Sequence, residues 1–252
     1  RERVERAAAL VRSAPPADGS ATMQVAQALL DEPDAAVGVR LPERIAASHF
    51  HALATDPAAA LRDLQRPVPQ PPSAASALGT AFHAWVQRRY RSTGWIESID
   101  EDAVASDAVP AVGAFDETRL RRLQDTFERS PWAGREPIDV ELALEYEIGG
   151  MIVPCKLDAV FPEGDAYVVV DWKTGAQPVT AVDLRRKQYQ LALYRLAYAA
   201  HRGIDPGTVS ACFYYVATDT EIRPQQLSDQ DELESVWAGV RSAAARSGVG
   251  SG

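Results

Sequence analysis

Residues 157–175 read LDAVFPEGDAYVVVDWKTG and contain a pattern typical of a buried β-strand. The segment 167–172 is β-branched and aromatic, and a glycine lies on either side of it, which favours a strand over a helix. Side chains alternate between the two faces of a strand, so Asp171 and Lys173 share one face. A carboxylate and an ammonium group are therefore expected close together at the end of this strand.

A second carboxylate, Asp158, lies on the apolar stretch that precedes this strand. A short turn at residues 162–165 joins the two stretches, so a hairpin could bring Asp158 beside Asp171. Carboxylate oxygens are the ligands that Mg²⁺ and Mn²⁺ prefer. Two carboxylates and a lysine at one strand end suggest a metal site, whereas Asp171 and Lys173 taken alone could form a simple salt bridge.

The composition is ordinary for a globular protein, with 252 residues of which 46% are hydrophobic and 24% are charged. No apolar run reaches about 18 residues, so no membrane span is predicted. The first six residues, RERVER, lack a signal-like apolar segment, which predicts a fragment of a longer, cytoplasmic protein. Two cysteines, Cys155 and Cys212, are too few for an iron–sulfur cluster, and nothing in the sequence supports a disulfide between them.

The formal net charge of −9 is unfavourable for a protein that holds nucleic acid unaided, because affinity for phosphate depends on lysine and arginine. Either the partner is not a nucleic acid, or another chain or domain delivers it. The sequence has three lysines, Lys156, Lys173 and Lys187, against 23 arginines. A lysine beside two carboxylates therefore suggests a need for its compact, mobile ammonium group.

Composition divides the chain into three parts. Residues 1–65 are Ala-rich with helical spacing and are predicted to form a helical lead-in from a preceding domain. Residues 66–78 begin with RPVPQPP and are predicted to form a proline-rich, semi-rigid linker. Residues 79–252 are predicted to form the main domain.

A helix is predicted around residues 78–90, with an apolar stripe from Phe82 to Tyr90. His83 lies beside this stripe. A lone histidine at the edge of an apolar helix face is more often structural than catalytic, so both roles stay open for His83.

Residues 140–148 alternate between polar and apolar side chains, as expected of a half-buried strand. The polar face carries Glu141, Glu145 and Glu147. The glycine pair 149–150 is typical of a two-residue hairpin turn. The strand with Asp158 is therefore expected between this strand and the one at residues 167–172.

A long helix is predicted from residue 181 to residue 201. Its buried side is predicted to consist of Tyr189, Leu193, Leu196 and Ala200. Gln190 and Tyr194 share an adjacent face with Lys187, and they could simply pack the helix edge on the sheet. Strands at 209–217 and 221–227 and a helix at 230–245 are expected to follow.

Five of these motifs, in this order, resemble those of the RecB-family nucleases of the PD-(D/E)XK, restriction-endonuclease-like superfamily. They are GTAFH at residues 79–83, Glu141, Asp158, DWKTG at 171–175 and QLALY at 190–194. One such motif is weak, whereas five in register are specific. Residues 41–78 further resemble the segment that joins motor to nuclease in actinobacterial AdnAB-type helicase–nucleases, AdnB more than AdnA.

The resemblance implies an α/β fold with a restriction-endonuclease-like mixed central sheet flanked by helices, after a helical N-terminal lead-in. It assigns residues 79–252 to a RecB-like nuclease domain. It also implies that His83, Asp158, Asp171 and the backbone carbonyl of Trp172 bind Mg²⁺ or Mn²⁺. The imidazole ligand favours Mn²⁺ somewhat.

Catalytic roles follow from the same resemblance. Asp158 and Asp171 would act through the metal, and Lys173 would orient or deprotonate the attacking water. Gln190 and Tyr194 would position the nucleophile or the phosphate. Glu141 would be a further catalytic acid, although two other glutamates share its face.

The implied function is that of a metal-dependent deoxyribonuclease in double-strand-break end processing. The implied partners are DNA, a helicase motor domain in the same longer chain and a second helicase–nuclease subunit, with no membrane. No Gly-x-x-x-x-Gly-Lys-Ser/Thr phosphate loop occurs, so the motor is not expected in this fragment. A motor that feeds DNA would explain the acidic charge. The alternative is a catalytically inactive nuclease-like module that binds DNA or a partner subunit.

One residue departs from the family pattern. Cys155 stands where the family usually has a glycine shortly before the metal-binding aspartate. It lies on the strand face opposite Lys156 and Asp158, so we expect a packing substitution. The clustered cysteines of the family's iron–sulfur members are absent, which argues against the AddB-like branch and the CRISPR-associated iron–sulfur nucleases.

Overall fold

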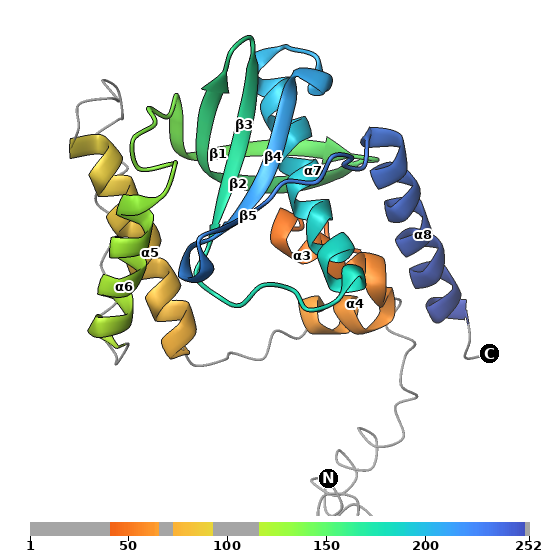
Figure 1. The fold of residues 1–252 in the computed structure, drawn as a ribbon. Helices are drawn as coiled ribbons and strands as arrows, with labels where there is room; N and C mark the ends of the chain where they lie inside the picture. Colours follow the sequence, from red (N-terminus) through yellow and green to blue (C-terminus); the bar gives the residue numbers. More distant parts are fainter. Residues whose placement is uncertain (1–40, 66–72, 93–115, 250–252) are drawn as a thin grey trace, which may run out of the picture.

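The computed structural model describes residues 41–65, 73–92 and 116–249, which form one mixed β-sheet with helices on both faces (Figure 1). The strands are β1 (Asp139–Ile148), β2 (Met151–Glu163), β3 (Ala166–Lys173), β4 (Val209–Tyr215) and β5 (Thr220–Ile222). The α-helices are α3 (Ala47–Thr55), α4 (Pro57–Gln65), α5 (Ala74–Ser92), α6 (Glu117–Arg129), α7 (Ala181–Arg202) and α8 (Gln230–Val249). The predicted α/β class with a mixed central sheet flanked by helices is confirmed.

The strands lie side by side in the order β1-β2-β3-β4-β5. β3 and β4 are parallel, and the other three neighbouring pairs are antiparallel. Parallel neighbours need a crossover connection, which α7 provides. Gly149 and Gly150 have φ of 52° and 83°, so both adopt the conformation that the predicted two-residue hairpin turn requires. The strand with Asp158 lies between β1 and β3, as predicted.

Helices α5 and α6 cover one face of the sheet (Figure 1). Their core is aromatic, and the ring of Phe127 on α6 meets the ring of Trp172 on β3 edge to face at 5.3 Å. Its large buried side chains are Phe82, Tyr90, Phe127, Trp132, Phe161, Trp172 and Tyr214. The predicted apolar stripe of α5 is thus confirmed, and its packing fixes where His83 lies.

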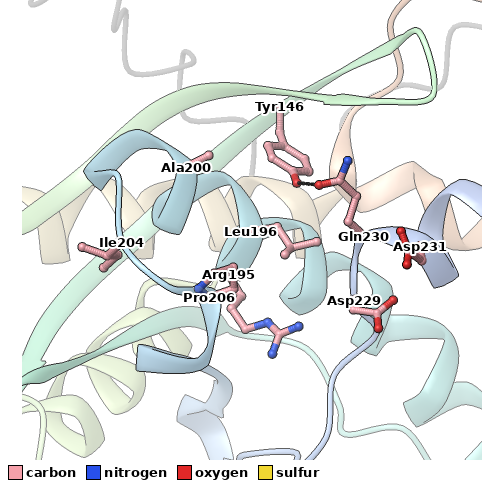
Figure 2. A pocket seen from close by; sticks show the side chains of 9 residues that line it. All are labelled: Tyr146, Arg195, Leu196, Ala200, Ile204, Pro206, Asp229, Gln230 and Asp231. Atoms are coloured by element: carbon pink, nitrogen blue, oxygen red, sulfur yellow. Dashed lines mark hydrogen bonds between the residues drawn. The ribbon is translucent and has the colours of Figure 1, made fainter.

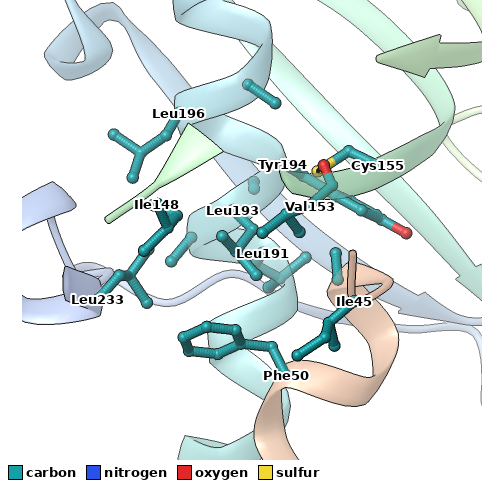
Figure 3. Close-up of a cluster of buried hydrophobic side chains, with 14 of the residues drawn as sticks. Ile45, Phe50, Ile148, Val153, Cys155, Leu191, Leu193, Tyr194, Leu196 and Leu233 are labelled. Atoms are coloured by element: carbon teal, nitrogen blue, oxygen red, sulfur yellow. Dashed lines mark hydrogen bonds between the residues drawn. The ribbon is translucent and has the colours of Figure 1, made fainter. Parts of the chain in front are cut away.

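Helix α7 covers the other face and is itself covered by α3, while α8 packs against α3, α4 and β1 (Figure 1). Because α7 lies between the sheet and α3, it is buried on most sides from Leu191 to Ala199. Ala200 is exposed, so its predicted place on the buried side was wrong. Cys155 packs beside Tyr194 in this core, as expected of a packing substitution (Figure 3). Both cysteines are buried free thiols.

The start of helix α5 lies within the segment that was predicted as a linker. Helix α5 begins at Ala74, so residues 74–78 of the predicted linker are helical, and Ser73 Oγ accepts the hydrogen bond of the Ser76 amide that starts the helix. Residues 1–40 and 66–72, with the predictions made for them, lie outside the described residues.

The segment before α3 joins the sheet. The Ile45 amide donates to the Ile152 carbonyl at 3.0 Å, and the Ile152 amide donates to the Glu43 carbonyl at 2.9 Å. Ile45 and Phe50 are buried in the same core as α7. The end of the predicted lead-in therefore packs on the sheet, while the domain boundaries stay a prediction.

The C-terminal elements also differ in length from those predicted. Strand β4 ends at Tyr215 because a 3₁₀ turn follows. Strand β5 is confined to Thr220–Ile222 rather than 221–227, since Pro224 has no amide hydrogen to donate to a sheet. Helix α8 continues beyond 245 to Val249. Among the described residues, no helix is long and apolar enough to cross a membrane.

Candidate metal centre and active site

Three carboxylates lie at one level on three neighbouring strands. The pairing of β1 with β2 places Glu141 opposite Asp158. The pairing of β2 with β3 ends at Ala159 and Val170, so Asp158 and Asp171 are the next residues on their strands. The row of acids across β1, β2 and β3 therefore follows directly from strand register.

In both β1 and β2, the alternation of side chains between the two faces of the sheet is interrupted at the acidic residue, Glu141 in β1 and Asp158 in β2. Glu141 has a φ of 54°, a conformation that residues other than glycine rarely adopt. Val140 packs in the core under α5 and Leu142 against the core under α7, although residues two apart on a regular strand share a face. β2 changes in the same way between Leu157 and Ala159. Unusual backbone of this kind is found preferentially at functional sites.

Helix α5 delivers His83 to these acids. The Nδ1 atom of His83 lies 3.2 Å from Asp158 Oδ1 and 3.8 Å from Glu141 Oε1. Burial opposes protonation of the imidazole, but the charges and hydrogen bonds of Asp158 and Glu141 outweigh it and raise the pKa of His83 to about 10. The structure thus places His83 in an ion pair with the acids of the sheet, and not only at the edge of an apolar helix face.

Asp171 forms the centre of a second set of contacts. Its Oδ2 atom lies 2.5 Å from Lys173 Nζ, and its Oδ1 atom accepts a hydrogen bond from Gln190 Nε2 at 2.9 Å. Gln190 also contacts Tyr194 Oη at 2.8 Å and accepts from Lys173 Nζ at 3.3 Å. Burial and then the Asp158 charge raise the pKa of Asp171, while the Lys173 ammonium opposes this. Helix α7 therefore contributes contacts to Asp171, not only packing.

The backbone of Trp172 connects the two sets of contacts. Its amide donates a hydrogen bond to Asp158 Oδ2 at 2.8 Å, where β2 and β3 have stopped pairing. Its indole ring is buried in the aromatic core. Asp158 is consequently held from both sides, by α5 through His83 and by β3 through the Trp172 amide.

Lys156 is a contact that the sequence interpretation did not assign to the site. Its ammonium lies 2.6 Å from Glu141 Oε2. The signal was present, because Lys156 lies two residues before Asp158, a spacing that puts both on one face of a regular strand. The other glutamates of β1 are exposed, and Glu145 pairs with Arg44. Of the three acids on that face, the structure thus brings only Glu141 to His83.

Most of the chain is similar to one known protein family. A family model described as the PD-(D/E)XK nuclease superfamily matches residues 44–248. The chain belongs to this superfamily. No curated protein matches it.

Two solved structures are similar to this PD-(D/E)XK chain. One is a Eubacterium rectale protein named as a candidate exonuclease, with 14% identity, a TM-score of 0.48 and 82% of each chain covered. The other is the protein SSO0001, with 11% identity and a TM-score of 0.38, covering 81% of this chain and 78% of that one. Both are too distant to support a functional conclusion.

The donor set of this superfamily member fits a divalent cation. His83, Glu141 and Asp158 each offer one ligand atom, and these atoms lie within 4.8 Å of one another. Asp171 Oδ2 is buried without a hydrogen bond and makes only its ion pair with Lys173. Imidazole nitrogen and carboxylate oxygen are ligands for Mg²⁺ or Mn²⁺. Raised pKa values of both His83 and Asp171 in one cluster are a common feature of functional sites.

A separate cavity of about 410 Å³ lies between β1, α7 and the start of α8 and includes none of these residues (Figure 2). Its polar groups serve the surrounding fold: Arg195 donates to the carbonyl of Ser228, Tyr146 donates to Gln230, and Asp229 caps α8 through the Glu232 amide. We therefore assign this cavity no ligand.

Replacing Asp171 by Asn is expected to leave thermal stability unchanged or raised at pH 7. The pKa of Asp171 is raised in the folded protein, so its ionisation costs stability as the pH rises above its ordinary value, and Asn removes that cost. A thermal melt measures this. A fall of about 5 °C or more would mean that Asp171 serves mainly as a structural ion pair.

The pKa of Glu163 is shifted in the opposite direction from that of Asp171. Burial opposes its ionisation, but Arg223 at 2.7 Å and Arg135 at 3.4 Å outweigh it and lower its pKa. A lowered pKa contributes stability that is present above the ordinary value and lost as the pH falls through the folded value. Glu163→Gln should therefore lower the melting temperature at pH 7, in contrast to Asp171→Asn.

Proposed function

We propose that this chain is a metal-dependent deoxyribonuclease that hydrolyses phosphodiester bonds. The observation that carries the proposal is the meeting of His83, Asp158 and Asp171 beside Lys173 at the end of β3. The hairpin of β2 and β3 supplies the two aspartates and the lysine, and α5, which is far from it in the sequence, supplies the histidine. A simple salt bridge between Asp171 and Lys173 would need neither the histidine nor the second aspartate.

We assign His83, Asp158, Asp171 and the backbone carbonyl of Trp172 to the binding of Mg²⁺ or Mn²⁺. The chemistry that such an ion supplies when bound is polarisation of a phosphate oxygen and a lower pKa for water. Asp158 and Asp171 lie on adjacent strands of a sheet, which holds ligands more rigidly than loops do. Without a metal, His83 and Lys173 offset the charge of these carboxylates.

We assign Lys173 the role of acting on the attacking water and on the scissile phosphate. Its ammonium can orient the attacking water and offset the charge that develops on the phosphate oxygens, and its neutral amine form can take the proton of the water. In the reaction, the water oxygen forms a bond to phosphorus, the bond from phosphorus to the leaving oxygen breaks, and the leaving oxygen takes a proton. The contacts of Lys173 with Asp171 and Gln190 fix the place from which it acts.

The remaining residues position the reacting groups. The Gln190 amide holds Asp171 Oδ1 and lies against Tyr194 Oη, so this face of α7 can orient both the aspartate and an approaching phosphate. Glu141 is a further acid beside His83, and its ion pair with Lys156 fixes its direction. Removing any of these should weaken the reaction less than removing Asp158 or Asp171.

The biological setting that we propose is a helicase–nuclease that processes double-strand-break ends in the cytoplasm. Two observations support it: residues 41–78 resemble the segment before the nuclease in AdnB, and a net charge of −9 suits a domain to which a motor feeds DNA. The proposed partners are DNA, a motor domain in the same longer chain and a second subunit. The proposed parts are the lead-in 1–65, the linker 66–78 and the nuclease domain 79–252, with α3 and α4 completing the core.

A catalytically inactive module that binds DNA or a partner subunit is the alternative. Loss of a ligand side chain would favour it, and none of the assigned positions has lost its side chain. The retained side chains therefore favour an active nuclease over an inactive module.

The test is a nuclease assay on linear single-stranded and double-stranded DNA, with Mg²⁺, Mn²⁺ or EDTA, beside an Asp171→Ala control. An RNA of the same sequence tests the preference for DNA. Cleavage of DNA by the parent protein that EDTA or Asp171→Ala abolishes is the expected result. DNA binding without cleavage under every metal condition would support the inactive module instead.

A further inference from the structure

The N-terminal half of α7 carries cations on the face that points to the catalytic centre. Gln190 and Tyr194 define this face, because both lie in the hydrogen-bond network around Asp171. Helical spacing puts Lys187 and Arg186 on the same face, three and four residues before Gln190. Both residues are partly exposed, so their charged groups are accessible to a ligand.

Lys187 has no assigned role in the fold. Within the described part of the chain, its ammonium makes no ion pair or hydrogen bond with another side chain. Arg186 makes one weak contact, at 3.8 Å from Asp183. A lysine without a partner beside a reaction centre is available to a ligand of opposite charge.

Two of the three lysines contact acids of this centre, and the third lies on the helix that carries Gln190, although arginines are far more numerous. Lys173 contacts Asp171, Lys156 contacts Glu141, and Lys187 lies one helical turn before Gln190. In a chain with a net charge of −9, the few compact ammonium groups therefore lie on the elements that form this centre.

We propose that Lys187, assisted by Arg186, binds the backbone phosphate adjacent to the scissile phosphate. This assignment rests on the proposed nuclease function. One helical turn spans about 5.4 Å, which corresponds to between one and two nucleotides at a rise of about 3.4 Å per nucleotide. The nucleic acid strand then runs from α7 across the end of β3, with Lys156 on the far side of the centre.

Arg185 is the matched control for Lys187. It lies on the same turn of α7 and also makes no side-chain contact in the described part of the chain, but its helical position faces away from Gln190. Lys187→Gln and Arg185→Gln therefore remove one positive charge each, and neither disturbs a contact of the fold. A general effect of net charge would appear equally in both.

The experiment measures cleavage of a short single-stranded DNA by the 252-residue chain over a range of salt concentrations. Lys187→Gln should raise KM by about tenfold with little change in kcat, the size expected from one hydrogen bond to a charged group. The slope of log kcat/KM against log salt should fall in magnitude by about 0.7, as for one lost phosphate contact. Arg185→Gln should match the parent, and Lys187→Arg should restore most of the binding.

Neutralising single phosphates of the DNA as methylphosphonates locates the contact. For the parent, kcat/KM should fall by about tenfold when the phosphate next to the scissile one is neutral. For Lys187→Gln, the same change of substrate should lower kcat/KM little further. Two results would overturn this assignment alone, provided that the parent cleaves DNA. One is that Lys187→Gln behaves like Arg185→Gln, and the other is that the loss from Lys187→Gln and the loss from the neutral phosphate simply add. A parent protein that cleaves no DNA would overturn the proposed function and this assignment with it.

Discussion

Asp158→Asn is expected to abolish both Mn²⁺ binding and DNA cleavage. Asp158 lies between His83 and the Trp172 amide, so it is the residue through which α5, β2 and β3 meet. Asn can still accept the hydrogen bond of the Trp172 amide, which preserves the local fold, but it lacks the negative charge that a divalent cation requires. Calorimetry should detect no Mn²⁺ binding heat. The cleavage rate should fall by about 10³-fold or more, because a metal contributes several kcal/mol to such reactions.

Glu147→Gln is the control for this variant. It removes the same charge from the neighbouring strand β1, where Glu147 is exposed and away from His83. Mn²⁺ binding and cleavage should equal those of the parent, and both variants should melt as folded proteins. Full Mn²⁺ binding by Asp158→Asn would show that the metal centre lies elsewhere.

The part of the site that the sequence predicted is the part that strand periodicity controls. The β-branched segment before Asp171 has a period of two, so the shared face of Asp171 and Lys173 follows from local geometry. The short turn at 162–165 and the glycine pair at 149–150 fix the order of three strands. Local rules of this kind placed Asp158 and Asp171 at one level before any tertiary contact was known.

The part that the sequence alone left open depends on packing between distant elements. His83 reaches Asp158 only because Phe82 and neighbouring apolar side chains of α5 pack against the aromatic face of the sheet. Periodicity also could not single out Glu141, because the left-handed backbone at that residue breaks the pattern that its strand otherwise follows. The resemblance to a nuclease family supplied both residues, and their contacts now give a physical reason for them.

Lys173→Gln is expected to separate metal binding from catalysis. The Lys173 ammonium is 2.5 Å from Asp171 Oδ2 and opposes the approach of a cation, so its removal should leave Mn²⁺ affinity equal to that of the parent or higher. Cleavage should nonetheless fall by about 10²-fold or more, since the water and the phosphate lose their positively charged partner. Calorimetry and single-turnover cleavage on the same preparation measure the two effects.

Lys173→Arg and Arg241→Gln complete this test. Lys173→Arg keeps the charge but replaces a compact ammonium with a planar guanidinium that does not release a proton, so it should recover little cleavage. Arg241 is an exposed residue of α8, and its replacement by Gln should change neither measurement. If Lys173→Gln cleaves DNA like the parent, the end of β3 is not the catalytic centre. If it loses Mn²⁺ binding as well as cleavage, the lysine holds Asp171 in place for the metal, and another group must act on the water.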